Sequence, residues 1–236
     1  ADVIGLQNVG GIVGRADKSQ IIDSISVSDV SGSTNVGGIV GDVIEIYTPP
    51  HHPPADPSSI IRCFASGNIT ATEYTSYAGG VAGRVYSGLV KESYSTVTVT
   101  GINYVGGFIG EANMTDIENS FSNATVHADA QPYLPGTGGF VGIYSGNNIE
   151  YNYSSSNLSS VDSAGFAGSY NPSGQDENNY WNQEISGVTS SNIGAPLSTY
   201  QMTCVTDSQM VCSGETGNPF SAWDEAIWYF GDENQY

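Results

Sequence analysis

The chain has 236 residues, of which 24 are acidic and 5 basic, and its formal net charge is −19 at pH 7. Nucleic acids and anionic lipid head groups are excluded as favoured partners, since both are negatively charged. Only 12% of the residues are charged, however, and regularly spaced apolar residues distinguish the chain from an acidic disordered tail.

A glycine-rich pentapeptide recurs six times. The copies are GGIVG at 10–14 and 37–41, GGVAG at 79–83, GGFIG at 106–110, GGFVG at 138–142 and AGFAG at 164–168. Their first residues are 27, 42, 27, 32 and 26 positions apart, which indicates stacked repeats of about 27 residues with two insertions. A phosphate-binding loop would need a following helix and usually a lysine, and the sequence supplies neither. We expect the glycines to form corners, through positive φ or close backbone approach.

Three apolar columns run through the segments between the pentapeptides, at offsets 0, 4 and 9 of each segment. The first is Ile21, Ile60, Val90, Ile117 and Ile149, the second is Ile25, Phe64, Tyr94, Phe121 and Tyr153, and the third is Val30, Ile69, Val99, Val126 and Leu158. Short runs rich in β-branched and aromatic residues predict strands. We expect all three columns to face the interior.

A unit of this length cannot bury its own apolar face, so neighbouring units must stack. The sequence therefore predicts an all-β fold, a right-handed parallel β-solenoid of about six coils with an irregular C-terminal cap. The repeats span 1–169, with insertions at about 43–59 and 128–137, and the cap spans 170–236.

The predicted cap contains all three tryptophans, Trp181, Trp223 and Trp228. We expect them to cover the last coil, with a sugar-stacking site as the alternative. No comparable segment covers the N-terminal coil, and an open edge there predicts further repeats or contact with another subunit.

The first insertion is proline-rich around His51 and His52. It predicts a stiff contact loop that binds another molecule. Adjacent histidines on an extended segment point apart, and no third ligand has a fixed spacing, so no metal site is predicted.

Tyr86, Tyr144 and Tyr170 each follow a pentapeptide by two or three residues. Stacking of the coils would align them along one lateral edge. Such a row would either stack on sugar rings or shield the corner of the coil.

Cysteines and sequons indicate possible covalent modification. A disulfide is expected between Cys204 and Cys212, while Cys63 is expected to be a free thiol among small neighbours, with an intermolecular bridge as the alternative. Five Asn-x-Ser/Thr sequons are candidate glycosylation sites, although Ser, Thr and Asn are abundant enough for sequons to arise by chance: Asn68, Asn113, Asn123, Asn152 and Asn157.

The pentapeptides, with segments such as Ile117 to Ser122 and the tail residues Tyr180-Trp181-Asn182, resemble GLUG-motif repeat proteins. This resemblance covers nearly the whole chain, although Ala164 replaces a glycine in the sixth copy. It implies a secreted or cell-surface, adhesin-like protein of bacteria or archaea, and it carries no catalytic residues.

The predicted function is noncatalytic and extracellular: a module at the cell surface that is either adhesive or a self-assembling part of a sheath, filament or surface layer. Its expected partners are carbohydrate, protein or copies of itself, with no cofactor, no nucleic acid and no membrane insertion. The enzymatic alternative is a β-helix polysaccharide lyase or glycoside hydrolase. Against it, basic residues are scarce, no nucleophile motif is present, and no column of carboxylates is evident, although Asp29, Glu118 and Glu150 could pair by chance.

Overall fold

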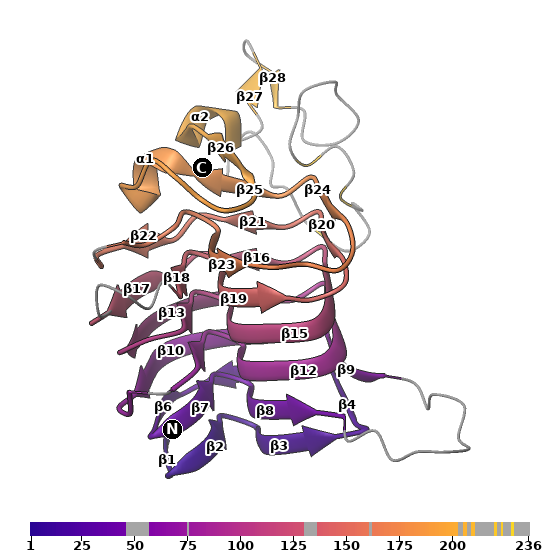
Figure 1. Cartoon of the computed structure of the whole chain (residues 1–236), viewed down its shortest axis with the longest axis vertical. Helices are drawn as coiled ribbons and strands as arrows, with labels where there is room; N and C mark the ends of the chain where they lie inside the picture. Colours follow the sequence, from indigo (N-terminus) through magenta and orange to yellow (C-terminus); the bar gives the residue numbers. More distant parts are fainter. Residues whose placement is uncertain are drawn as a thin grey trace.

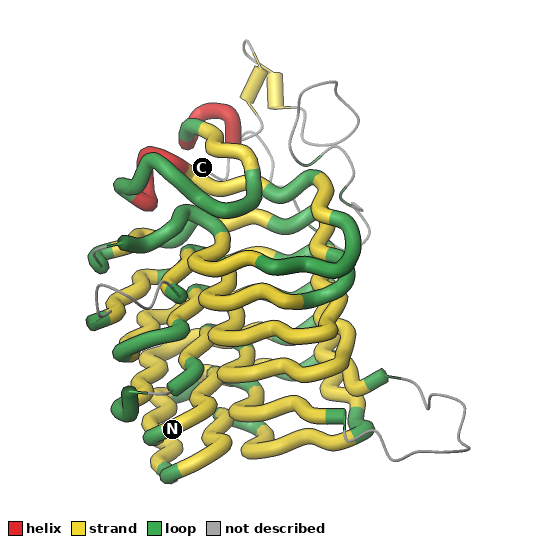
Figure 2. The backbone as a smooth tube through the Cα atoms, viewed as in Figure 1, coloured by secondary structure: helices red, strands yellow, loops and turns green. Residues whose placement is uncertain are grey.

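The computed structural model describes residues 1–45, 57–74, 76–129, 136–160, 162–202, 205–206 and 209–210, together with Phe220, Trp223 and Trp228. Within this part, the chain winds into a right-handed β-solenoid of about five turns, slightly fewer than predicted (Figures 1 and 2). The all-β solenoid prediction is thus confirmed. None of the described helices has the length and apolar character needed to cross a membrane.

Three parallel sheets form the walls of the solenoid. Sheet A contains β1 (Asp2–Ile4), β5 (Ile25–Val27), β6 (Asp29–Gly32), β10 (Phe64–Ala71), β13 (Tyr94–Gly101), β16 (Phe121–Ser122), β17 (Thr125–Ala128), β21 (Tyr153–Ser154), β22 (Asn157–Leu158), β25 (Tyr180–Asn182) and β26 (Ala195–Leu197). Sheet B contains β2 (Gln7–Gly10), β7 (Thr34–Gly37), β11 (Ala78–Gly79), β14 (Val105–Gly106) and β18 (Thr137–Gly138). Sheet C contains β3 (Val13–Asp17), β4 (Gln20–Ile22), β8 (Val40–Ile44), β9 (Ser58–Ile61), β12 (Ala82–Lys91), β15 (Ile109–Glu118), β19 (Val141–Ser145), β20 (Ile149–Glu150), β23 (Ala167–Tyr170) and β24 (Asp176–Glu177).

Short elements follow the last coil. They are the helices α1 (Gln183–Ser186) and α2 (Thr199–Met202) and an antiparallel pair, β27 (Val205–Thr206) and β28 (Gln209–Met210).

The pentapeptide glycines allow the backbones of successive coils to approach closely. A Cβ on Gly38 would overlap the carbonyl oxygen of Gly80 in the next coil, and a Cβ on Gly80 would overlap that of Gly107. None of the pentapeptide glycines has positive φ. Close approach, and not a left-handed backbone, is therefore the reason for glycine at these corners.

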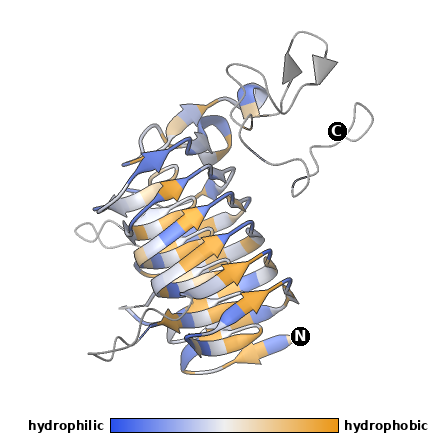
Figure 3. Cartoon of the chain, turned by 90° about the vertical axis from the view of Figure 1, so that its right-hand side faces the viewer, coloured by the Kyte–Doolittle hydropathy of each residue, from blue (hydrophilic) through white to orange (hydrophobic). Residues whose placement is uncertain are grey.

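The third pentapeptide residue points into the core. From the second coil onward these side chains are 0% exposed: Ile39, Val81, Phe108, Phe140 and Phe166. The three phenylalanines form a continuous stack, with ring centroids 4.7 Å apart at both steps. Hydrophobic residues recur at matching places on successive coils (Figure 3).

Two of the three predicted apolar columns face the interior, and one does not. The first and third columns are buried, at 9% exposure or less. The second column is in register from coil to coil, as predicted, but its members point outward. Ile25 is 70% exposed, and Phe64, Tyr94, Phe121 and Tyr153 are partly exposed. The expectation that this column faces inward is therefore wrong.

A left-handed residue at one corner of each coil explains the outward column. The residue two positions after each member of the first column has φ between 46° and 57°: Asp23, Arg62, Glu92, Asn119 and Tyr151. Asn178, directly after β24, has a similar φ of 55°. This turn shifts the alternation of side chains by one position. The small polar residue next to the turn points inward, and the aromatic residue after it points outward.

The small residues at this corner form a buried polar ladder. The backbone N–H of Cys63 donates to Ser93 Oγ over 3.0 Å, that of Ser93 to Ser120 Oγ over 3.2 Å, and that of Ser120 to Asn152 Oδ1 over 3.0 Å. Each side chain thus satisfies a backbone donor of the preceding coil, as buried N–H groups require.

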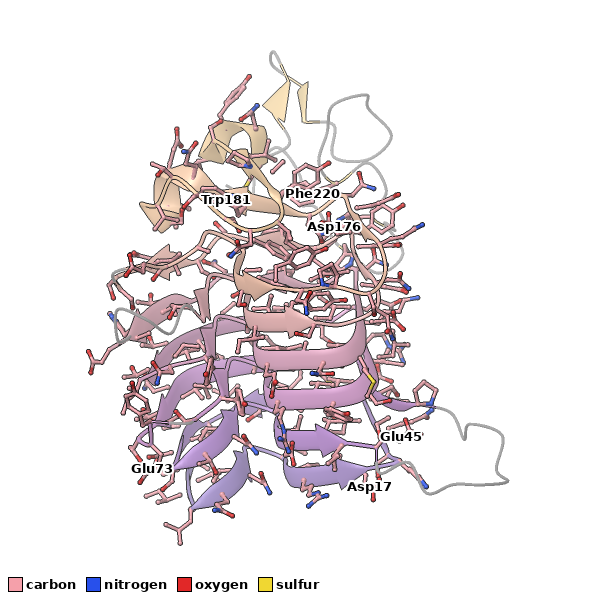
Figure 4. All side chains as sticks on the ribbon, viewed as in Figure 1. Asp17, Glu45, Glu73, Asp176, Trp181 and Phe220 are labelled. Carbon is pink, nitrogen blue, oxygen red and sulfur yellow. The ribbon has the colours of Figure 1, made fainter. Side chains whose placement is uncertain are left out.

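Several described residues after 180 pack against the last coil, although β24, β25 and β26 still continue the parallel sheets beyond 170. The Trp181 ring lies where a Cβ on Gly165 would be, and it is 1% exposed (Figure 4). Asn192 Nδ2 donates to the carbonyls of Ala167 and Gly168 at the edge of β23. Pro196 lies in β26, the last strand of sheet A, where a missing N–H hinders further pairing.

Candidate functional site

The outer face of sheet A carries a groove of about 430 Å³ that crosses several coils. Its lining residues are Gly67, Asn68, Thr96, Val97, Thr98, Asn123, Ala124, Thr125, Ser155, Asn157 and Ile185. We call this the polar groove.

Strand alternation produces the polar lining. In β13, Thr96 and Thr98 point outward on either side of the buried Val97. The parallel register repeats this arrangement in each coil, so Thr96 lies level with Ser66 below and Thr98 lies level with Asn68 below and Thr125 above. Ordinary solenoid packing thus aligns hydroxyl and amide groups along the axis.

The groove follows an interruption in sheet A. β16 ends at Ser122 and β17 begins at Thr125, and the same gap separates β21 from β22. The carbonyl of Gly139 and the hydroxyls of Ser122 and Ser156 are linked behind this gap by hydrogen bonds of 2.8 and 2.9 Å. These buried bonds hold the interrupted strands in place, so the groove is built on fixed backbone.

No lining residue of the polar groove is titratable. The polar side chains are three asparagines, three threonines and one serine, which offer both donors and acceptors. A ligand that matches this lining is uncharged and rich in hydroxyl groups. Charged ligands would gain no ion pair from the groove and would meet the negative field of the whole chain if they were anionic.

An aromatic ladder runs beside the polar groove, two residues earlier on each strand. It comprises Phe64, Tyr94, Phe121 and Tyr153, whose rings stack in series with centroids 4.4, 4.7 and 4.9 Å apart. Stacked rings on successive coils give the outer face of sheet A a flat apolar strip.

Three aromatic residues of the C-terminal tail lie against this ladder. The ring centroid of Trp228 is 5.3 Å from that of Phe121, and the centroids of Phe220 and Trp223 are 5.2 and 5.6 Å from that of Tyr153. We predicted that Trp223 and Trp228 cover the end of the solenoid, and this is wrong. Both pack on its side, against the aromatic ladder.

The three tyrosines predicted to form a lateral row do not do so. Tyr144 is in register with Tyr170, but it is fully buried and donates its hydroxyl to the Thr115 carbonyl over 3.0 Å. Burial raises the pKa of the Tyr144 hydroxyl. The Tyr170 hydroxyl instead donates a hydrogen bond of 2.9 Å to the Asp176 carboxylate. Tyr86 is exposed and aligns with Asn113, one residue out of phase with this pair. The predicted lateral row of three tyrosines is therefore wrong: Tyr144 belongs to the core.

The remaining predicted positions divide into three groups. His51, His52, Cys204 and Cys212 lie outside the described residues. Three sequon asparagines, Asn68, Asn123 and Asn157, are exposed and line the polar groove, and Asn113 is partly exposed. Asn152 is 0% exposed and bonded to the carbonyls of Ile117 and Glu150. Glycosylation at Asn152 in the folded chain is therefore ruled out, because its amide is buried.

Cys63 is free, as predicted, and 1% exposed. Its Sγ lies 3.5 Å from the Ile21 carbonyl oxygen. Burial raises the pKa of the thiol, which disfavours the reactive thiolate. An intermolecular bridge through Cys63 would require opening of the coil.

We expect Cys63 to react with a maleimide ~1,000-fold or more slowly in the native protein than in guanidinium, because labelling requires unfolding of the surrounding coil. Peptide mapping by mass spectrometry separates Cys63 from the other two cysteines. Rapid native labelling of the Cys63 peptide would contradict the buried position.

A column of carboxylates, not anticipated from the sequence, lies on sheet C. Glu118 is in register with Glu150, and Glu150 with Glu177. The pKa of Glu150 is raised by partial burial and by the charges of Glu177 and Glu118. The repeated Ile-Glu pairs at 117–118 and 149–150 were the available signal. Among the described residues, no group of three or more potential ligands is placed to hold a metal.

A second polar cluster, on β8 and its neighbours, is paired within itself. Asp42 is 1% exposed and accepts two hydrogen bonds, of 2.8 and 3.1 Å, from Arg84. Arg15 lies 4.0 Å from the same carboxylate. Burial raises the pKa of Glu111, which is next to Arg84 in register. The ion pairs of Asp42 link the three strands β3, β8 and β12 and leave no charge of Asp42 open to a ligand.

The fold and the groove together define a parallel β-solenoid with an uncharged polar groove on one outer face. Comparison with known proteins adds no identity: no family model, no curated protein and no solved structure matches the chain.

Proposed function

We propose that the protein is a noncatalytic, extracellular adhesive module that binds uncharged glycan in the polar groove. The observation that supports this most directly is the lining of the groove, where hydroxyl and amide side chains from successive coils are aligned without a charged group among them.

The repeated lining suits a polymer better than a single sugar. The coils are about 4.8 Å apart, as adjacent strands are in any sheet. A chain of sugar units that lies along the solenoid axis meets equivalent donors and acceptors in each coil. Weak contacts then add over several coils, which is how a surface of neutral hydrogen bonds reaches useful affinity.

The proposed cell-surface location rests on sequence. The resemblance to GLUG-motif repeat proteins implies secretion, and a surface rich in Ser, Thr and Asn with few charged residues agrees with it. The strong negative charge of the chain repels anionic polymers. Among polysaccharides, neutral glycans are therefore the expected ligands.

Replacement of two groove residues tests the proposal. We expect the double variant Thr98→Val and Asn123→Ala to bind a neutral polysaccharide about tenfold more weakly, because each substitution removes a hydrogen bond of about 0.5–1.5 kcal/mol. A glycan array selects the polysaccharide, and titration calorimetry measures the affinity.

The matched control is Thr100→Val, which changes an exposed threonine of the same strand that does not line the groove. Its affinity should equal that of the parent chain. Full binding by the double variant would show that the glycan does not bind in the polar groove. Loss of binding in the control would also contradict the proposed site.

A glycoside hydrolase is the second candidate, because Glu118 and Glu150 are register neighbours and the pKa of Glu150 is raised. Retaining hydrolases use two carboxyl groups about 5–5.5 Å apart, one of them with a raised pKa. Neither residue lines the polar groove. Cleavage of any polysaccharide that disappears in Glu150→Gln would favour this candidate and reject the noncatalytic module.

A further inference from the structure

Three of the five sequons present their recognition groups together on the outer face of sheet A. In each, the middle residue is 9% exposed or less, while the asparagine before it and the Ser or Thr after it are exposed or partly exposed. These sequons are Asn68-Ile69-Thr70, Asn123-Ala124-Thr125 and Asn157-Leu158-Ser159. A transferase that recognises Asn-x-Ser/Thr thus finds both groups on one open face.

The other two sequons do not present both groups. The asparagine of one, Asn152, is buried. In the sequon that begins at Asn113, the hydroxyl residue Thr115 is 0% exposed and donates to the Asn113 carbonyl over 2.8 Å. Neither sequon is therefore open to a transferase in the folded chain.

The local backbone further separates the three outward sequons. Asn68 lies inside the continuous strand β10, and its Nδ2 donates to Asp29 Oδ1 over 2.7 Å. Asn123 instead lies in the interruption between β16 and β17, and Asn157 begins β22 directly after the second interruption. In the described part of the chain, no hydrogen bond engages the side-chain amide of Asn123 or Asn157. Loop-like backbone and a free amide are what an acceptor asparagine needs.

The surroundings of Asn123 suit an attached sugar. The Asn123 backbone is held in place, because its N–H donates to the Ser95 carbonyl over 2.9 Å. Thr96 and Thr98 of the preceding coil and Ser155 of the following coil line the same groove. An N-acetylhexosamine is uncharged, and its hydroxyl and acetamido groups match this hydroxyl and amide lining.

We propose that Asn123 is an N-glycosylation site of the folded chain, with Asn157 as a second site, and that the sugar on Asn123 lies in the polar groove. The reaction needs an oligosaccharyltransferase and a sugar carried on a lipid diphosphate. A bond forms between Asn123 Nδ2 and the anomeric carbon, and the bond from that carbon to the phosphate oxygen breaks. Nδ2 loses one proton, and the lipid diphosphate leaves.

The attached sugar would fill the groove that also takes free glycan in the proposed function. Modification of Asn123 and binding of free glycan then exclude each other. This consequence rests on the proposed function, whereas the site itself does not.

Glycosylation of the purified, folded chain tests the site. The chain is incubated with a transferase and a lipid-linked N-acetylhexosamine donor, and glycopeptides are mapped by mass spectrometry. Relative to matching synthetic peptides, Asn123 and Asn157 should be modified roughly tenfold or more above the other three sequons, because those are buried or held in a strand. An unmodified chain alongside modified peptides would overturn the proposal. So would equal modification of all five sequons.

The variant Ser159→Ala tests where the sugar lies. It removes the sequon of Asn157 without changing a residue that lines the groove, so the remaining acceptor at the interruptions is Asn123. We expect nuclear Overhauser contacts between the attached sugar and the methyl groups of Thr96 and Thr98. The control, Asn123→Gln, should show none of them.

A sugar attached to Asn123 that contacts neither threonine would overturn its placement in the groove. This outcome is distinct from failure of the proposed function. If the unmodified chain bound no free polysaccharide, the proposed function would be rejected, while the glycopeptides and the sugar contacts would still decide this proposal.

Discussion

Replacing Phe140 by alanine is expected to lower the free energy of unfolding by about 3–5 kcal/mol. Phe140 is 0% exposed and stacks between Phe108 and Phe166 in the middle of the interior column. Removing the ring leaves a cavity that the rigid coils above and below cannot fill. Denaturant unfolding measures the loss.

The matched control for Phe140 is Phe121→Ala, which removes an identical side chain from the outer ladder. Phe121 is only partly buried, so its loss should cost less than about 2 kcal/mol. Equal costs for the two substitutions would contradict the assignment of one phenylalanine to the core and the other to the surface.

Gly80→Ala is expected to destabilise the solenoid by about 4 kcal/mol or more. The added Cβ would overlap the carbonyl oxygen of Gly107 and would lie 2.7 Å from Ser95 Cβ. The added methyl group would have backbone atoms on one side and a buried side chain on the other, so it could not move away from either. It would therefore push adjacent coils apart.

The control for Gly80 is Gly187→Ala after α1. Gly187 has φ of 69°, and a Cβ there would meet nothing within 4 Å. Its substitution should lower the free energy of unfolding by only about 1–2 kcal/mol, the cost of placing alanine in a left-handed backbone conformation. Thermal and denaturant unfolding of both variants compare the two effects, and a smaller cost for Gly80→Ala would contradict the proposed role of the pentapeptide.

The architecture could be predicted from sequence because stacking imposes the same demand on every coil. Gly-Gly corners and the columns that contain Ile117 and Val126 repeat at matching positions, and both columns are buried as expected. The outward turn of Phe121 could not be predicted. It depends on the left-handed backbone of Asn119. The residues at the equivalent corners of other coils, Arg62, Glu92 and Tyr151, are not residue types that usually adopt this conformation, so the sequence does not indicate the turn.

The candidate site was harder to predict than the architecture. The tyrosines fail for a simpler reason: Tyr86 is three residues after its pentapeptide and Tyr144 only two, so strand alternation places them on opposite sides of the wall. The polar groove depends on register between coils whose spacing in sequence varies. The threonines at 96, 98 and 100 were visible in the sequence, but their alignment with Asn68 and Asn157 was not.

The packing of the tail on the aromatic ladder has a consequence for the order of folding. Coil-to-coil contacts join residues a few tens of positions apart, so each coil can add to its predecessor while synthesis continues. The contact between Tyr94 and Trp228 spans more than half of the 236 residues and forms only after residue 228 has left the ribosome. During that interval the aromatic ladder of the nascent solenoid lacks its cover from the tail, and exposed apolar surface of this kind promotes misassociation.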